Sequence, residues 1–158
     1  MTDFEFYNPV KVFFGKDQLQ KISTQIPAGS KVMLLYGGGS IMKNGVYERV
    51  RAALERFDVT DFGGIEPNPL YETAMKAVEL AREKNINFLL AVGGGSVIDA
   101  TKYIAAAIPY KLGDPWNILA KKMPVISAIP LGAVLTLPAT GSEMNKNSVI
   151  SRKSTSEK

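Results

Sequence analysis

The tetrapeptide Gly-Gly-Gly-Ser occurs twice in this chain, at residues 37–40 and 93–96, and each copy follows a short run rich in apolar residues. The two runs cover residues 31–36 and 86–92, and apolar runs of this length are typical of strands buried on both faces of a parallel sheet. Apolar residues at helical spacing follow each copy, which a flexible linker would not show. The repeat therefore predicts two strand–glycine loop–helix units in one α/β sheet.

Other strands and helices are expected to alternate with these two units. Alternating strands and helices predict a doubly wound, Rossmann-like parallel sheet, in which ligands bind at the carboxyl ends of the strands. The expected helices cover residues 17–26, 45–57, 71–84, 97–107 and 118–122, and further strands are expected at residues 59–62 and 125–130.

The two ends of the chain differ from this pattern. Aromatic and β-branched residues alternate and cluster around Pro9 in residues 4–14, which predicts an N-terminal edge strand or hairpin. In residues 145–158, Val149 and Ile150 are the only strong hydrophobes, so an exposed hairpin or a frayed end is expected there.

Composition excludes several classes of protein. With 158 residues, 46% of them hydrophobic, one globular domain is expected. The net charge is +4, but the basic residues are scattered, so no nucleic-acid partner is expected. The apolar runs fall far short of the roughly 20 residues that span a bilayer, and no signal pattern or cysteine is present. A cytoplasmic protein without a membrane segment is the expectation, and the absence of histidine removes the commonest metal ligand and general base.

The second glycine loop carries the strongest chemical signal. Glycines let the backbone turn sharply off a strand and approach a ligand closely, and the helix that follows offers unpaired N–H groups. Those properties suit a pyrophosphate, with Gly94, Gly95 and Ser96 as its contacts. Two alternatives stay open, because any tight strand-to-helix turn can use glycine and the Ser96 hydroxyl can simply cap the helix.

The first glycine loop predicts the choice of cofactor. Gly38, Gly39 and Ser40 include no acidic residue of the kind that grips an adenosine ribose 2'-hydroxyl, and their small size leaves room for a 2'-phosphate. Lys43 either pairs with that phosphate or is simply solvated. We therefore expect NADP rather than NAD.

Other polar residues are expected at the same edge of the sheet. Asp99 and Lys102 lie three residues apart on one helix and share a face, either as a solvated ion pair or beside the pyrophosphate. Thr136, Thr140 and Ser142 offer hydroxyl groups in a loop that follows a predicted strand, although Ser and Thr are also ordinary turn residues.

An ordered series of motifs resembles the iron-containing alcohol dehydrogenases, in the branch of butanol dehydrogenases and NADP-dependent aldehyde reductases. The resemblance runs from residue 12 to about residue 153. It rests on Phe14-Gly15-Lys16, Tyr36-Gly-Gly-Gly-Ser40, Gly63-Gly-Ile-Glu-Pro-Asn-Pro69, Gly93-Gly-Gly-Ser-Val-Ile-Asp99, Lys102, Asp114-Pro-Trp116 and Leu137-Pro-Ala-Thr-Gly-Ser-Glu143.

The resemblance implies a dehydroquinate synthase-like fold, with an N-terminal α/β nucleotide domain and a C-terminal helical domain. It places the adenosine ribose and its 2'-phosphate near Gly38, Gly39 and Ser40, with Asn68 on the adenine side. It assigns Asp99 to the nicotinamide region and Lys102 to the phosphate side. It also implies that Thr136, Leu137 and Ser142 line the cofactor cleft.

The resemblance also implies what residues 1–158 lack. Relatives bind iron or zinc through an Asp and three His of the helical domain, and this sequence contains no His. We therefore expect a truncated, nucleotide-binding domain with no metal site and no catalytic residue, inactive alone. A small alcohol or aldehyde would bind only together with the missing domain.

Two alternatives come from other classes of protein. A non-catalytic nucleotide-binding or dimerisation module would pair residues 4–14 with a second chain. A kinase would need a Walker motif, which is absent. A homo-oligomer is expected in any case, because losing the helical domain would uncover an apolar cleft wall around Ile98, Leu135 and Leu137.

Overall fold

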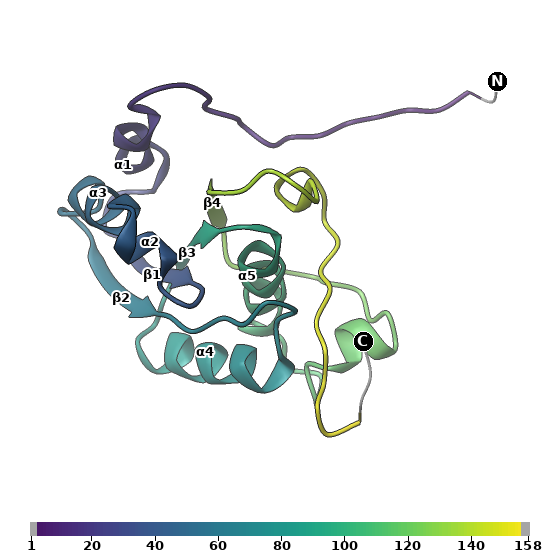
Figure 1. Cartoon of the computed structure of the whole chain (residues 1–158). Coiled ribbons are helices and arrows are strands. Elements are labelled where there is room, and N and C mark those ends of the chain that lie inside the picture. Colours follow the sequence, from purple (N-terminus) through teal and green to yellow (C-terminus); the bar gives the residue numbers. More distant parts are fainter. Residues whose placement is uncertain (1–2, 156–158) are drawn as a thin grey trace.

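The computed structural model describes residues 3–155, which form a sheet covered by helices on both faces (Figure 1). Four parallel strands lie in the order β2-β1-β3-β4. Their bounds are Lys31–Tyr36 for β1, Asp58–Phe62 for β2, Phe88–Gly93 for β3 and Leu131–Leu135 for β4. The predicted doubly wound parallel sheet is confirmed.

Helices occupy the connections between the strands. Before β1 lie the 3-10 helix η1 (Gln18–Lys21) and α1 (Ile22–Gln25), and β1 leads to β2 through α2 (Ser40–Lys43) and α3 (Val46–Ala53). Helix α4 (Tyr71–Glu83) connects β2 to β3. Helices α5 (Gly95–Ala107) and α6 (Asn117–Ala120) connect β3 to β4, and the 3-10 helix η2 (Ser142–Met144) follows β4.

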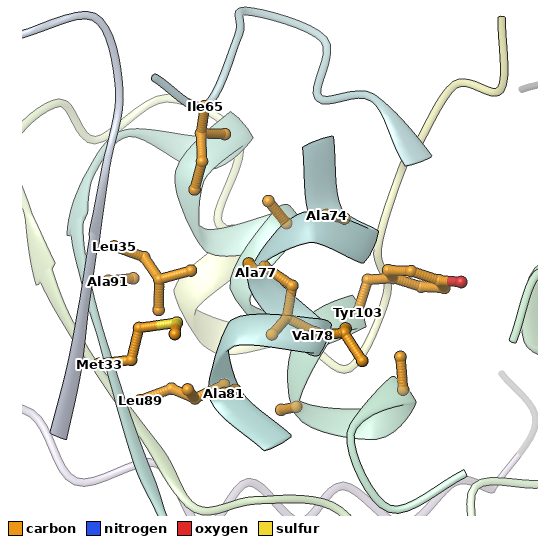
Figure 2. Packing of buried hydrophobic residues seen from close by; sticks show 14 of the residues in the cluster. Met33, Leu35, Ile65, Ala74, Ala77, Val78, Ala81, Leu89, Ala91 and Tyr103 are labelled. Atoms are coloured by element: carbon orange, nitrogen blue, oxygen red, sulfur yellow. The ribbon is translucent and has the colours of Figure 1, made fainter. Parts of the chain in front are cut away.

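Each strand of the middle pair sends alternate side chains into two separate cores, because successive side chains of a strand point to opposite faces. Met33 and Leu35 of β1 join a cluster with α4 and α5, and Val32 and Leu34 join a second cluster with α1 and α3. Figure 2 shows the first cluster, in which the strand side chains meet the small alanines of α4. A continuous apolar run is therefore required in β1 and β3.

The order in which the strands are connected defines where a crevice opens at one end of the sheet. The chain leaves β1 toward β2 and later leaves β3 toward β4, so the strand order reverses between β1 and β3. A crevice opens at the carboxyl ends of the two strands at such a reversal. Both Gly-Gly-Gly-Ser sequences lie at these carboxyl ends, one directly after β1 and one beginning with the last residue of β3.

The predicted N-terminal strand or hairpin is wrong. Residues 3–14 form no strand, and Figure 1 shows this purple segment running clear of the sheet. Phe4 is 83% exposed and Phe14 is 96% exposed. β-propensity describes a fit to a half-buried pleated surface, and this segment packs against neither edge of the sheet.

The strand predicted at residues 125–130 is also wrong. Val125 and Ile126 are exposed, and the strand is β4, which begins at Leu131. The amide of Ile129 donates to the carbonyl of Ala105 on α5, and pairing with β3 starts at the carbonyl of Pro130. Proline lacks the N–H that an interior strand position needs, so the ladder begins after it.

Two residues that were predicted to be exposed, one in the C-terminal tail and one in the cleft wall, are buried in the core. Ile150 is buried and packs in the cluster of α4 and α5, and the next residue, Ser151, pairs with Leu70. The tail is therefore anchored rather than frayed at these residues, while the part of the prediction on residues 156–158 lies outside the described chain. Ile98 is also buried, so it forms no exposed cleft wall, whereas Leu137 is exposed.

Candidate functional site

The second glycine loop is a tight turn from β3 into α5. Gly94 caps the helix with extended backbone, no side chain caps the first turn, and that turn holds no acidic residue. A Cβ on Gly93 would lie 2.6 Å from Cγ2 of Val97, and one on Gly95 would lie 2.5 Å from Oγ1 of Thr140. Glycine is therefore required for close packing at both positions, and no side chain caps the N–H groups at the start of α5.

The first glycine loop is more open. Gly39 has a φ of 97°, which favours glycine, and a Cβ on Gly38 or Gly39 would meet nothing within 4 Å. The loop lies beside residues 63–65, because the amide of Gly64 donates to the carbonyl of Gly37 over 3.1 Å. Space at Gly38 and Gly39 is thus free for a ligand group.

A cleft of about 200 Å³ lies at the amino end of α5. It brings together five of the residues expected at this edge of the sheet, which come from the loop before α4, from α5 and from the loop after β4. The predicted residues lining it are Asn68, Gly95, Ser96, Asp99 and Thr140, and the others lining it are Pro69, Val149 and Ser151. The backbone of Asn68 is left-handed, with a φ of 57°, a conformation that Asn tolerates better than most residues.

Asp99 and Lys102 of α5 form a half-buried ion pair that also binds the segment after β4. Nζ of Lys102 lies 3.2 Å from Oδ1 of Asp99 and donates to the carbonyl of Ser142 over 2.9 Å. The Ser142 hydroxyl donates to the same carboxylate oxygen over 2.5 Å. The amide of Val149 donates to Oδ2 over 3.2 Å. The pair therefore attaches residues 142–149 to α5, and it is not a solvated ion pair, since the two side chains are only 12% and 18% exposed.

The remaining predicted residues do not line this cleft. The amide of Thr136 donates to the carbonyl of Gly93 over 3.0 Å, which holds the loop after β4 against the second glycine loop. Cβ of Leu137 would lie 3.8 Å from a Cβ on Gly94. The predicted residues outside the lining are Gly38, Gly39, Ser40, Gly94, Lys102, Thr136, Leu137 and Ser142.

Val149 and Ser151 line the cleft and were not predicted. The sequence contained one signal for them, the isolated pair of hydrophobes Val149 and Ile150 in a polar tail. Ile150 anchors this segment in the core, and its two neighbours then face outward into the cleft.

An aromatic and charged cluster lies at the far end of the same segment. The Tyr71 hydroxyl donates to Oδ1 of Asp114 over 2.5 Å, and the amide of Trp116 donates to that oxygen over 2.9 Å. Arg152 pairs with Oδ2 of Asp114 over 3.1 Å. Burial opposes ionisation, but these hydrogen bonds and the Arg152 charge hold the pKa of Asp114 below its ordinary value. Burial, with the hydrogen bond to Asp114, raises the pKa of Tyr71 to about 12.

Residues 3–155 contain neither a cluster of metal ligands nor a membrane-spanning helix. No group of three or more His, Cys, Asp or Glu side chains could hold a metal ion in that part of the chain. Iron therefore finds no fitting ligand set among the described residues. No helix there has the length and apolar character needed to cross a membrane.

The comparison with known proteins decides the family. Residues 9–158 match the family model described as iron-containing alcohol dehydrogenase. The chain belongs to the iron-containing alcohol dehydrogenase family.

Two curated relatives match over the whole chain, and both come from the predicted branch of this family. The NADPH-dependent aldehyde reductase YqhD of Escherichia coli is 54% identical over 160 residues, covering 100% of this chain and 41% of the relative. The probable NADH-dependent butanol dehydrogenase 2 of Bacillus subtilis is 51% identical over 161 residues, again covering 100% of this chain and 41% of the relative. The chain thus spans about two fifths of the length of these alcohol dehydrogenase family members.

Solved structures of the family share the fold. The crystal structure of YqhD from E. coli superposes with a TM-score of 0.93 at 54% identity, over 97% of this chain and 40% of that chain. The NADH-dependent butanol dehydrogenase A of Thermotoga maritima gives a TM-score of 0.93 at 42% identity, over 98% of this chain and 40% of that chain. The predicted family and fold are confirmed.

Proposed function

We propose that the chain binds a nicotinamide dinucleotide, NADP in preference to NAD, in the crevice at the carboxyl ends of β1 and β3. It would serve as the nucleotide-binding part of a metal-dependent alcohol dehydrogenase or aldehyde reductase. The observation that carries the proposal is the tight second glycine loop at the start of α5, in a chain of this family. Residues 1–158 are, on this proposal, one nucleotide-binding domain.

The phosphate assignment rests on the geometry of that loop. The start of a helix presents N–H groups and the positive end of the helix dipole, both of which favour an anion. Gly94 and Gly95 have no side chain to keep a pyrophosphate away from these groups, and the Ser96 side chain lines the cleft. The acid-free first turn of α5 adds no repulsion.

The preference for NADP rests on the first loop. Residues 37–40 contain no carboxylate that would repel a 2'-phosphate, and the space above Gly38 and Gly39 is free. The names of the relatives include both cofactors, since YqhD is NADPH-dependent and the Bacillus protein is called NADH-dependent. The loop chemistry, rather than the relatives, supports the choice.

The chain's own residues bind and orient the cofactor, and they supply no group that would polarise an alcohol or aldehyde oxygen. The name of the family indicates that iron polarises this oxygen. The described residues offer no set of ligands for iron. We therefore propose that hydride transfer needs a further part, and that residues 1–158 are inactive alone. A small alcohol or aldehyde would then be a substrate of the larger assembly only.

Isothermal titration with NADP⁺ and with NAD⁺ tests the proposal. Gly94→Asp places a carboxylate in the phosphate loop, and Gln20→Glu adds the same charge on η1, which packs on the other face of the sheet. We expect NADP⁺ to bind more tightly than NAD⁺, Gly94→Asp to lose binding and Gln20→Glu to keep it. Failure of a folded wild-type chain to bind either cofactor would overturn the proposal.

One observation favours a dimerisation module as the second candidate function. Large hydrophobic side chains of residues 3–14 are exposed, and such a segment invites pairing with another chain. Light scattering on the wild type and on a variant with Phe4, Phe6 and Phe14 changed to Ser tests it. A dimer that the variant loses would support a homo-oligomer formed through this segment, and a monomeric wild type would count against it.

A further inference from the structure

A segment after β4 forms one wall of the cleft and is attached at two places. We define the strap as residues 142–152. At its first attachment, Asp99 and Lys102 of α5 hold Ser142 and the amide of Val149, and the Ser148 hydroxyl donates to the carbonyl of Asp99 over 2.7 Å. Figure 1 shows this yellow segment passing α5 and the amino end of α4.

The second attachment joins the strap to the start of α4. The amide of Tyr71 donates to the carbonyl of Ser151 over 2.8 Å, and the amide of Ser151 donates to the carbonyl of Pro69 over 2.9 Å. Val149 at the first attachment and Ser151 at the second line the cleft together with Asn68 and Pro69. The shape of the cleft therefore depends on where the strap is held.

Arg152 fastens this end of the strap from outside the cleft. Its guanidinium lies 4.7 Å from the centre of the Tyr71 ring and 5.6 Å from that of Trp116, and it pairs with Asp114 over 3.1 Å. Its side chain is only 23% exposed. The planar guanidinium can stack on rings and pair with a carboxylate at once, which the ammonium of lysine does less well.

We propose that Arg152 is a positioning residue for dinucleotide binding: by clamping residue 152 to Asp114, Tyr71 and Trp116, it holds Val149 and Ser151 as the wall of the phosphate-side cleft. Arg152 does not line the cleft, so it acts through the strap and not by touching the cofactor. This inference rests on the proposed function.

Trp116 provides a direct readout, because it is the only tryptophan of the chain and lies against Arg152. We expect the fluorescence emission of Trp116 in the wild type to change as NADP⁺ is added. The midpoint of this change should agree with the dissociation constant from calorimetry. The oxidised cofactor is used because the reduced nicotinamide absorbs tryptophan emission. Arg152→Met should remove this change.

Affinity gives the second readout, measured well below the thermal midpoint of every variant. We expect Arg152→Met to weaken NADP⁺ binding by about fivefold or more, a typical coupling between two sites, and Arg152→Lys to fall between it and the wild type. Arg49→Met is the matched control, since Arg49 pairs with Asp17 at an exposed position on α3 and should bind like the wild type. If Arg152→Met does not fold, Asp114→Asn removes the same ion pair from the other side.

The outcomes separate the two proposals. A wild type that binds no dinucleotide overturns both the function and the clamp. A wild type that binds, with Arg152→Met lowering only the thermal midpoint while affinity and the Trp116 response stay unchanged, overturns the clamp alone. Equal weakening by Arg49→Met would also overturn it, because the effect would then come from loss of charge.

Discussion

The two Gly-Gly-Gly-Ser sequences are identical, yet they adopt different structures. In the first, Gly39 caps α2 in a left-handed conformation, and the helix that follows spans only Ser40–Lys43. In the second, Gly94 caps α5 in an extended conformation, and the helix that follows spans Gly95–Ala107. The start of the helix is shifted by one residue relative to the tetrapeptide.

The surroundings of the two loops account for the difference. Gly95 packs against Thr140 of the loop after β4, whereas a Cβ at the equivalent Gly39 would meet nothing within 4 Å. Val97 lies between the loops, because a Cβ on Gly37 or on Gly93 would contact its Cγ2. The same tetrapeptide therefore makes a packed loop at one position and an open loop at the other.

The largest effect is expected at the first glycine of each loop. Gly93→Ala forces a Cβ to within 2.6 Å of Val97 in the core, so the free energy of unfolding should fall by about 1–3 kcal/mol, as for other overpacked cores. Gly37→Ala meets the carbonyl of Ile65 at 3.3 Å and should cost less. Urea unfolding of both variants measures the difference, and equal losses would mean that the loops are packed alike.

The third glycine of each loop separates binding from backbone strain. Gly95→Ala places a methyl group on Thr140 and in the cleft, so NADP⁺ affinity should fall by about tenfold or more, which is about 1.4 kcal/mol. Gly39→Ala instead imposes a left-handed backbone on alanine, which costs about 1–2 kcal/mol of stability. Titration calorimetry and thermal unfolding on both variants give the two numbers. A larger loss of NADP⁺ affinity in Gly39→Ala than in Gly95→Ala would contradict this difference between the two loops.

The smallest effect is expected at the second glycine. A Cβ on Gly38 meets nothing, and one on Gly94 makes ordinary contact with Leu137 at 3.8 Å. Both alanine variants should unfold within about 0.5 kcal/mol of the wild type. On addition of NADP⁺, Gly94→Ala should lose more of the thermal stabilisation by the ligand than Gly38→Ala, and equal stabilisation of the two variants would place the pyrophosphate elsewhere.

The fold was predictable where a buried element has a pattern of apolar residues within one continuous stretch of sequence. The strand at residues 31–36 and the helix α4 were expected nearly as they are found, because both faces of the strand and one face of the helix are apolar. Residues 125–130 and 4–14 also contain many apolar side chains, but neither segment forms a strand in the described chain. Propensity does not reveal whether a partner strand exists.

The candidate site was predictable where a motif is local. Gly95, Ser96 and Asp99 follow one strand, and the structure brings them into one cleft with Asn68. Val149 and Ser151 were missed because they reach the cleft through contacts with α4 and α5, far away in the sequence. The use of Asp99 and Lys102 to hold the strap was missed for the same reason.

The most direct test of the account is an NMR titration of the ¹⁵N-labelled chain of 17.2 kDa with NADP⁺, following individual backbone amides. We expect the amides of Gly95 and Ser96 to shift most, as they would on gaining an anion at the start of α5, with a second set of shifts at residues 38–40. Binding that leaves the amides of residues 94–96 unchanged would contradict the assignment of the second glycine loop as the phosphate site.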